Sequence, residues 1–330
     1  MPASLQSVRI AAASYRLPAK YVPLSELRNG NGLQIKSDRE RLQIPKLGSL
    51  DLNEIEGVHV FGTEERGDLA LEAIRDTLSE SDVDGRQLDV IIDYSTVSRA
   101  DNGLSLSYRV QDQLQADRAF LMATGNGSCV AFQIALKAAT ALFHSDPSIQ
   151  QALLFSEDRI LGHRDNAPFN VLGDGASAVL LQRSPLPVSI VGTLCISRGQ
   201  LRAYLGINHS QSGNFDFDGF EQHVVPLYYK HMRDVALALL RKHDCSLDDV
   251  ALVLYQNMSD NDYVGITGAL GIARDRIYPG ALRGHGHIFG ADLVINLSSA
   301  MRHNRIHPGA RILMLSSGAG FSWAATLLKA

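Results

Sequence analysis

The sequence predicts an α/β protein built from two copies of one layered unit. Four short apolar segments, each after a helical pattern and a turn, have the character of buried strands. They are LDVIIDYS (88–95), QALLFSE (151–157), VALVLYQ (250–256) and RILMLSS (311–317). Their spacing repeats: Tyr94 and Tyr255 are 161 positions apart (255 − 94), and Phe155 and Leu315 are 160 apart (315 − 155). This shared offset favours a duplication.

Chain length agrees with a duplicated architecture. The 330 residues exceed the usual size of a single hydrophobic core. We therefore expect two similar halves, residues 1–185 and 186–330, related by a pseudo-twofold axis.

The amino-acid composition limits the kinds of partner that the protein is expected to bind. The chain is 45% hydrophobic and 20% charged, with a net charge of −4, so no basic surface for nucleic acid or an anionic membrane is expected. The N-terminal residues do not have the pattern of a secretory signal, and no apolar run approaches membrane-spanning length, so neither a leader nor a membrane helix is expected. The three cysteines lack the spacing of a disulfide or zinc framework, which favours a cytoplasmic protein.

Cys129 is the candidate nucleophile. It lies in GNGSCVAFQIALKAATALF (125–143), where a glycine-rich turn meets an apolar helical pattern. The start of a helix exposes unpaired N–H groups, which favour a thiolate and can bind the oxyanion formed when it attacks a thioester. Gly125 and Gly127 would permit the tight backbone turn that such an arrangement requires. The structural alternative is a packed, inert cysteine.

The duplication predicts a partner for this cysteine in the second half. Adding 160 to 129 gives position 289, inside GHGHIFGADLVINL (284–297). If the halves pack by a pseudo-twofold, the two glycine-led helices begin near each other. We therefore expect His285 or His287 to come within reach of Cys129, as the base that activates a nucleophilic thiol.

These motifs resemble the thiolase-fold ketoacyl synthase III family over nearly the whole chain. The resemblance is carried by GNGSCVAFQIAL, NVLGDGASAVLL (170–181), SSGAGFSWAATLL (316–328) and the helix after GHIFGAD. It implies layered αβαβα halves, with Cys129 as the acyl acceptor. It also implies an oxyanion hole made by the Cys129 N–H and one N–H of the 318–320 loop, Gly318 and Gly320 being the glycines there.

The sequence departs from the family at its other two catalytic positions. Condensing members carry a histidine in an HQAN-type motif, but this chain reads YQNM, with Tyr255 in its place. His287 replaces the family asparagine, and Asp292 follows five residues later. We expect a Cys129–His287–Asp292 set, in which the acid orients the histidine. Asp292 as a simple helix-start acid and Asn257 as a replacement carbonyl donor remain alternatives, and His285 has the weaker claim as base.

A Cys-His-Asp set suits transfer of an acyl group to an acceptor that must lose a proton. The pattern resembles acyltransferases of natural-product pathways, including polyketide or antibiotic biosynthesis. It implies acyl-carrier-protein or coenzyme A thioesters as donors, a hydroxyl, amine or thiol acceptor, no resident cofactor, no metal and a homodimer. The alternatives are a decarboxylative condensing 3-oxoacyl synthase III, a non-catalytic partner subunit and, from the histidine pair and Asp292, a metal hydrolase.

Overall fold

The structure is a computed structural model. It describes residues 8–28, 55–96, 105–160, 165–166, 170–184, 188–201, 223–318 and 321–330, and within these ranges it does not describe the side chains of residues 126, 165 and 166. Its strands are β1 (Val8–Arg16), β2 (Lys20–Pro23), β3 (Gly57–Val60), β4 (Val90–Asp93), β5 (Phe120–Ala123), β6 (Gln151–Asp158), β7 (Asp165–Asn166), β8 (Asn170–Val171), β9 (Gly175–Arg183), β10 (Val188–Ser197), β11 (Val250–Tyr255), β12 (Arg311–Gly318) and β13 (Ser322–Lys329).

Helices connect and cover these strands. The α-helices are α1 (Leu24–Arg28), α3 (Asp68–Glu80), α4 (Leu106–Leu114), α5 (Ala131–Ser145), α7 (Val225–Lys242), α8 (Asp260–Leu270), α9 (Leu282–His285) and α10 (Ala291–Arg302). Short 3₁₀ turns are η2 (Gly85–Gln87), η4 (Gly125–Val130), η7 (Leu247–Asp249) and η8 (Arg274–Arg276). None of the helices in these ranges is long and apolar enough to cross a membrane.

The four predicted strands are confirmed as β4, β6, β11 and β12. They belong to a nine-stranded sheet of order β11-β12-β13-β10-β1-β9-β6-β4-β5. The order is mirrored about the β10–β1 pair, because β1-β9-β6-β4 on one side matches β10-β13-β12-β11 on the other. In each set the last two strands run parallel, while the other neighbouring pairs are antiparallel. The predicted division at residue 185 falls between β9 and β10, and independence of the two halves stays a prediction.

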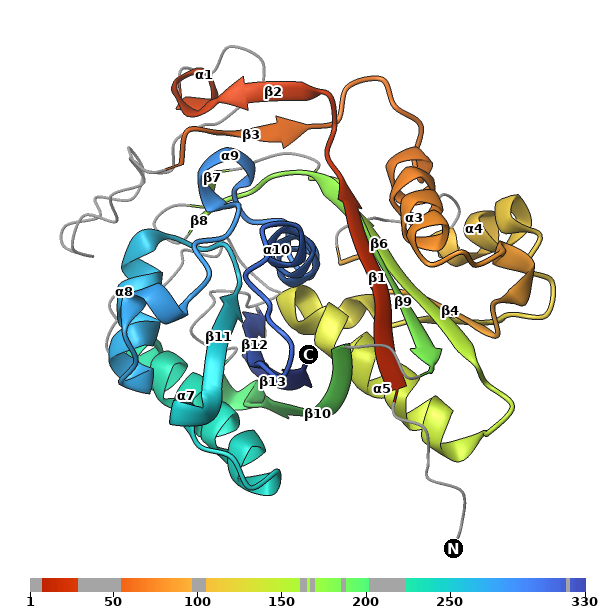
Figure 1. Ribbon diagram of the computed structural model, residues 1–330. Coiled ribbons are helices and arrows are strands. Elements are labelled where there is room, and N and C mark those ends of the chain that lie inside the picture. Colours follow the sequence, from red (N-terminus) through yellow and green to blue (C-terminus); the bar gives the residue numbers. More distant parts are fainter. Residues whose placement is uncertain are drawn as a thin grey trace, which may run out of the picture.

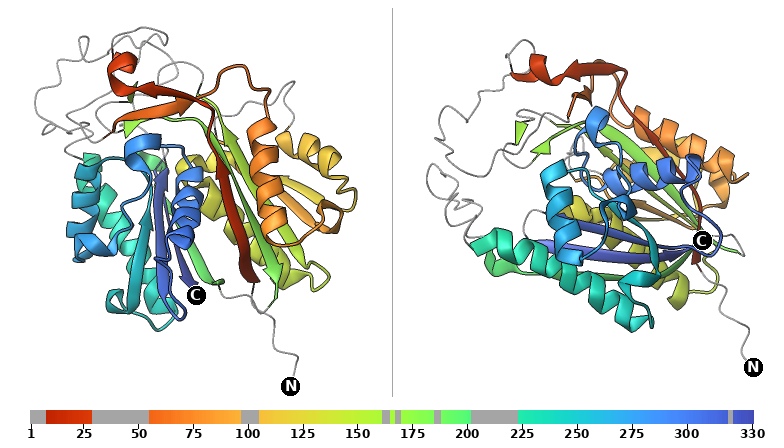
Figure 2. Two further views of the ribbon diagram at one scale, coloured as in Figure 1. Left: turned by 45° about the horizontal axis from the view of Figure 1, so that its top comes forward. Right: turned by 60° about the vertical axis from the view of Figure 1, so that its left-hand side comes forward.

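The helices form three layers around and between the two strand sets (Figure 1). Helix α3 covers β1 and β9 from outside, and α7 covers β10, β12 and β13. Between the sets lie α5 and α10, each of which touches strands of both halves. Figure 2 shows the same central pair from two further directions. The predicted αβαβα layering is therefore confirmed.

The central layer explains why α5 and α10 are so apolar. A helix that packs against elements on nearly every side must hide its whole circumference from water. In α10 every residue from Ala291 to Ala300 is buried. Helix α5 buries seven of its 15 residues and exposes Lys137, Ala141, His144 and Ser145, so one face of it is open to solvent.

Gln133 is a buried polar residue of α5 that joins the two halves. Its side-chain nitrogen donates to the Met314 carbonyl at 3.2 Å and to the Thr326 hydroxyl at 3.0 Å, and its oxygen accepts from the Ser316 hydroxyl. All three partners lie on β12 or β13. Because every polar atom of this amide has a partner, the central helix is fixed against the second half by specific bonds.

Gln133→Ala should lower the free energy of unfolding by about 2–4 kcal/mol, because it leaves buried groups on β12 and β13 without partners. Chemical denaturation followed by tryptophan fluorescence measures this change. The matched control is Lys137→Ala on the exposed face of the same helix, for which a change within about 0.5 kcal/mol is expected. Equal effects of the two substitutions would contradict the proposed cross-half role.

Candidate active site

Cys129 lies within η4, directly after a sharp bend in the backbone. The sequence places it in the first turn of the helix, but α5 begins two residues later, at Ala131. The bend occurs at Ser128, whose φ of 52° and ψ of −138° are strained for a residue with a side chain. The Ser128 carbonyl accepts a hydrogen bond from the Thr96 hydroxyl at 3.1 Å, which ties the bend to the end of β4.

The two glycines of the turn have different roles from those expected. Neither has a positive φ; the left-handed conformation belongs to Ser128. Gly125 is required by close approach, because an added Cβ would lie 2.1 Å from the Ser95 carbonyl oxygen. At Gly127 the nearest obstacle is the end of the flexible Ile134 side chain, at 2.6 Å. The expectation of a tight turn is correct, but strain at Ser128 and contact at Gly125 produce it.

His287 meets Cys129 across the two halves of the chain. The Cys129 sulfur lies 3.0 Å from Nε2 of His287, and Nδ1 of the same ring lies 2.5 Å from Oδ2 of Asp292. Cys129 is 8% exposed, His287 2% and Asp292 0%. The three residues that the sequence singled out therefore form one continuous buried chain of contacts.

The backbone of His287 is fixed by the segment that follows β8. Its N–H donates to the Val171 carbonyl at 2.8 Å, and its own carbonyl accepts from the Gly173 N–H at 3.0 Å. Gly286 precedes it with a φ of 63°, and a Cβ there would lie 2.4 Å from the Val171 oxygen. Only glycine fits this position, because both the conformation and the contact exclude a side chain.

Asp292 is held as an acceptor on both carboxylate oxygens. Oδ1 accepts the Ile288 N–H at 2.7 Å, and Oδ2 accepts the Asn257 N–H at 2.7 Å in addition to its contact with His287. Asp292 lies in the first turn of α10, where the helix dipole favours a negative charge. It therefore fits both the helix-start role and the orientation of His287.

Electrostatics favour the charged form of His287. Burial alone would lower the pKa of the imidazole, but the neighbouring Asp292 carboxylate and Cys129 sulfur together raise that pKa well above its usual value. A histidine that readily keeps a proton beside a thiol stabilises the thiolate by direct pairing. This arrangement is that of an activated cysteine.

Gly318, one of the predicted oxyanion-loop residues, lies beside the nucleophile. A Cβ added to it would come within 2.8 Å of the Gly127 oxygen and 3.4 Å of the Cys129 nitrogen. The end of β12 therefore packs directly on the bend that carries Cys129. Gly320, the other glycine of that loop, lies outside the described residues.

Three secondary residues have supporting rather than direct positions. Tyr255 is fully buried, with its hydroxyl 2.8 Å from the Tyr228 hydroxyl. Asn257 contributes its N–H to Asp292, as described above. His285 packs against His59 and Tyr15, with ring centroids 5.6 and 6.2 Å away, and burial lowers its pKa. The Cys129 sulfur lies within hydrogen-bonding distance of the Ser128 hydroxyl and of His287, so of the two histidines His287 is the one that meets the sulfur.

Asn296 is a site residue that sequence reasoning missed. It lies one turn after Asp292 on α10, and its side-chain nitrogen donates to the Asn257 Oδ1 at 3.0 Å and to the Tyr255 carbonyl at 2.8 Å. It thereby fixes the segment whose N–H holds Asp292. A polar residue four positions after Asp292 in an otherwise apolar helix was the available signal.

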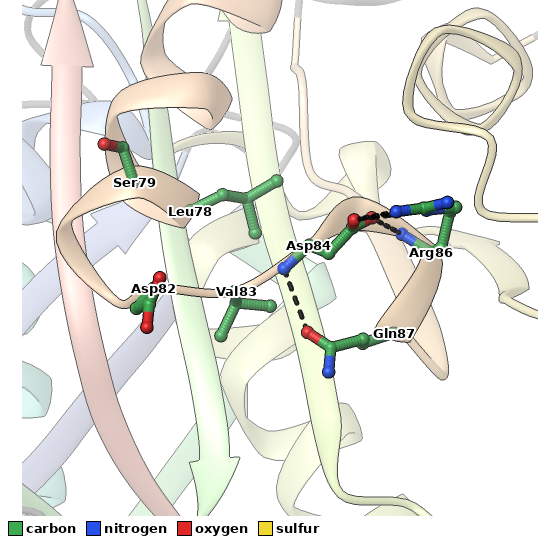
Figure 3. A pocket seen from close by; sticks show the side chains of 7 residues that line it. All are labelled: Leu78, Ser79, Asp82, Val83, Asp84, Arg86 and Gln87. Atoms are coloured by element: carbon green, nitrogen blue, oxygen red, sulfur yellow. Dashed lines mark hydrogen bonds and ion pairs between the residues drawn. The ribbon is translucent and has the colours of Figure 1, made fainter.

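A surface pocket lies away from Cys129, and a cluster suited to a metal ion is not found among the described residues. Figure 3 shows an open surface pocket at the end of α3 and around η2, where Asp84 bonds with Arg86 and Gln87. It contains no residue of the Cys129 site. Within the described part of the chain, no cluster of three or more His, Cys, Asp or Glu side chains could hold a metal ion.

Comparisons with known proteins agree with this architecture. The family model for the C-terminal region of 3-oxoacyl-[acyl-carrier-protein] synthase III matches residues 240–330. A β-ketoacyl-[acyl-carrier-protein] synthase III from Clostridium perfringens strain SM101 is 26% identical over 289 residues, covering 83% of this chain and 88% of the relative.

Two solved structures are similar over almost their whole length. The acyltransferase ChlB3 superposes with a TM-score of 0.83 at 21% identity, covering 98% of this chain and 97% of the other. The 3-oxoacyl-[acyl-carrier-protein] synthase III of Aquifex aeolicus VF5 gives 0.78 at 22% identity, with 98% and 100% covered. At this level of identity the likeness shows the fold.

Fold and comparisons together define the class: an α/β protein with the thiolase-like fold. Within that class, residues 240–330 match the family model of the 3-oxoacyl-[acyl-carrier-protein] synthase III C-terminal region, and the chain is similar to β-ketoacyl-[acyl-carrier-protein] synthase III proteins over most of its length.

His287→Ala should slow alkylation of Cys129 by iodoacetamide about tenfold or more at pH 6.5, because the paired cation that stabilises the thiolate is lost. The difference should shrink towards pH 10, where solvent removes the thiol proton without help. Rates are measured by mass spectrometry of the intact protein. His285→Ala is the matched control and should alkylate at the wild-type rate; a slower rate there than in His287→Ala would reverse the assignment.

Gly125→Ala should destabilise the protein by about 2 kcal/mol or more, because the new methyl group overlaps the Ser95 carbonyl. Thermal unfolding measures this effect. The control is Gly268→Ala, at an exposed position inside α8 with nothing within 4 Å of the new Cβ. That change should be neutral or stabilising by up to about 1 kcal/mol, since alanine favours the helix. A neutral Gly125→Ala would show that the turn does not require close approach.

Proposed function

We propose that this enzyme transfers acyl groups through a covalent thioester on Cys129 to an acceptor that loses a proton. The observation that carries the proposal is the continuous contact from Cys129 through His287 to Asp292. A base that contacts the nucleophile and is itself oriented by an acid is the arrangement of acyl-transfer triads.

The geometry supports a two-step reaction in which one proton is passed back and forth. The Cys129 thiolate attacks the carbonyl carbon of the donor thioester, and the donor thiolate leaves with the proton held by His287. His287 then takes the proton of the acceptor hydroxyl, amine or thiol as that group attacks the acyl-Cys129 carbon. The bond to sulfur breaks, and the thiolate is restored beside the imidazolium.

A second candidate is decarboxylative condensation, which the names of the relatives favour. The Clostridium and Aquifex proteins are both named as synthases of the β-ketoacyl or 3-oxoacyl type. Condensation requires donors for the enolate that forms on decarboxylation. In this chain Tyr255 replaces the family histidine and is fully buried, while Asn257 uses its side-chain oxygen to accept from Asn296 and Tyr263. We therefore place acyl transfer first.

Asn257 is the remaining support for condensation within this site. Its side-chain nitrogen is buried and has no hydrogen-bond partner among the described residues. Such a donor is available in principle to a thioester carbonyl. A variant at this position therefore belongs in the test of the two candidates.

The donor we propose is a phosphopantetheine thioester on an acyl carrier protein, with coenzyme A thioesters as the alternative. The support is that the names of the relatives include the acyl carrier protein. A role in polyketide or antibiotic biosynthesis, a homodimer and a cytoplasmic location remain predictions from the sequence. A non-catalytic partner subunit is disfavoured, because such a subunit would have no need of a buried Cys-His-Asp contact.

Incubation with acyl-carrier thioesters should add the acyl mass to wild-type protein and not to Cys129→Ala. His287→Ala should acylate at least about tenfold more slowly and should transfer to no acceptor. A malonyl thioester should give a malonyl-enzyme with no release of carbon dioxide. Intact-protein mass spectrometry and product analysis measure all three outcomes.

Carbon dioxide release or a β-keto product would overturn acyl transfer in favour of condensation. Asn257→Ala distinguishes the two further, because it should abolish decarboxylation if its amide is the enolate donor. If wild type and Cys129→Ala never differ in mass gain across the panel, the partner-subunit hypothesis gains support instead.

A further inference from the structure

A second hydrogen-bonded network lies behind the end of β12. Ser317 directly precedes Gly318, the residue that packs on the Cys129 bend. The Ser317 N–H donates to Oε1 of Gln256 at 2.9 Å, and the Gln256 nitrogen donates to the Ser317 hydroxyl at 3.0 Å. Tyr228 completes a closed triangle, because its hydroxyl lies 2.8 Å from the Ser317 hydroxyl and 3.0 Å from the Gln256 nitrogen.

The numbers of donors and acceptors in this triangle fix the direction of each hydrogen bond. A tyrosine hydroxyl donates one hydrogen bond and accepts two. Tyr228 accepts from Ser317 and from Gln256, so its own proton is left for the Tyr255 hydroxyl, 2.8 Å away. All four polar groups are therefore satisfied, and a fully satisfied buried network is rigid.

The network is anchored at its other end by a buried carboxyl group. Tyr229 donates to Oδ1 of Asp262 at 2.9 Å. Burial raises the pKa of Asp262 to about 6, although hydrogen bonds from Tyr255 and Tyr229 act to lower it. Its Oδ2 makes no close hydrogen bond to any described residue, so the Tyr255 interaction is a loose one. Helices α7 and α8 thus hold the tyrosines from one side and β11 from the other.

The opposite end of the network reaches the nucleophile. Ser317 is 7% exposed and Gln256 1%, so both are shielded from water at the place where β12 ends. Gly318 follows, and it lies so close to the bend that an added Cβ would be 2.8 Å from the Gly127 oxygen and 3.4 Å from the Cys129 nitrogen. Burial raises the pKa of the Tyr228 phenol, and the Cys129 sulfur adds a smaller electrostatic contribution in the same direction. The triangle and the reacting sulfur therefore share one buried region.

We propose that Tyr228 and Gln256 are positioning residues for the oxyanion hole: through Ser317 they hold Gly318 against the Cys129 bend and so orient the Cys129 N–H towards the thioester oxygen. The inference rests on the proposed function only in requiring that an acyl-enzyme forms on Cys129. It is independent of the acceptor. Neither residue contacts the sulfur, and both act through the end of β12.

Tyr228→Phe tests this role, because it removes one hydroxyl and keeps the ring. The probe reactions are acylation by a simple aryl thioester, without acceptor, and alkylation by iodoacetamide. Acylation passes through an oxyanion, whereas alkylation needs the thiolate alone. If the Cys129 N–H is misplaced by a fraction of an ångström, acylation should be about 10- to 100-fold slower than in the wild type. The rate of alkylation should stay within about twofold of the wild-type rate.

Ser317→Ala is the second variant, since it removes the link to the strand end without altering the tyrosines. It should show the same split between the two reactions. Tyr108→Phe, at a 56% exposed position on α4, is the matched control and should behave as wild type in both.

Equal losses in acylation and alkylation would overturn the proposal, because they would mean that the network supports the Cys129–His287 contact or the fold in general. Unchanged acylation in both variants would overturn it as well. Failure of the proposed function is recognised separately, in the wild-type protein: alkylation without any acylation there would overturn both.

Discussion

The contact between the Cys129 sulfur and the His287 ring is the interaction on which the site depends. The two residues are 158 positions apart, and each lies two to four residues before a helix of the central layer. The contact exists because the two strand sets are mirrored about β1 and β10, which brings α5 and α10 together. At Gly290 the helix starts nearly touch: an added Cβ would lie 3.2 Å from the Phe132 nitrogen.

Burying such a polar pair is costly unless every partner is satisfied. A series of hydrogen bonds that begins at the Cys129 sulfur meets this requirement. His287 satisfies Cys129, Asp292 satisfies His287, and the N–H groups of Ile288 and Asn257 satisfy Asp292. Asn296 then holds Asn257. Residues 287–296 supply most of these groups and meet Cys129 on one side and Asn257 on the other, so a small shift of α10 would disturb all of the contacts.

The family relationship and the site geometry answer different questions. The solved structures share the fold, and the Clostridium and Aquifex relatives are named β-ketoacyl- or 3-oxoacyl-[acyl-carrier-protein] synthase III. In this chain, the family histidine is a buried tyrosine and the family asparagine is a histidine with an acid behind it. Because these two positions decide which charge the site can stabilise, they bear on the reaction more strongly than the overall likeness does.

By itself, the sequence determined the class of fold and singled out Cys129, His287 and Asp292, which the structure brings into contact. Apolar runs at a repeated offset require strands in equivalent places, and glycine turns before apolar helices require buried helix starts. Tertiary structure alone decided that His287 and not His285 meets the sulfur, that Ser128 carries the backbone strain, and that Asn296, Tyr228 and Gln256 belong to the surroundings of the site. The periodicity of apolar residues in the sequence indicates which face of a helix or strand is buried. Hydrogen bonds between segments more than 20 residues apart depend instead on atomic positions that only the packed chain defines.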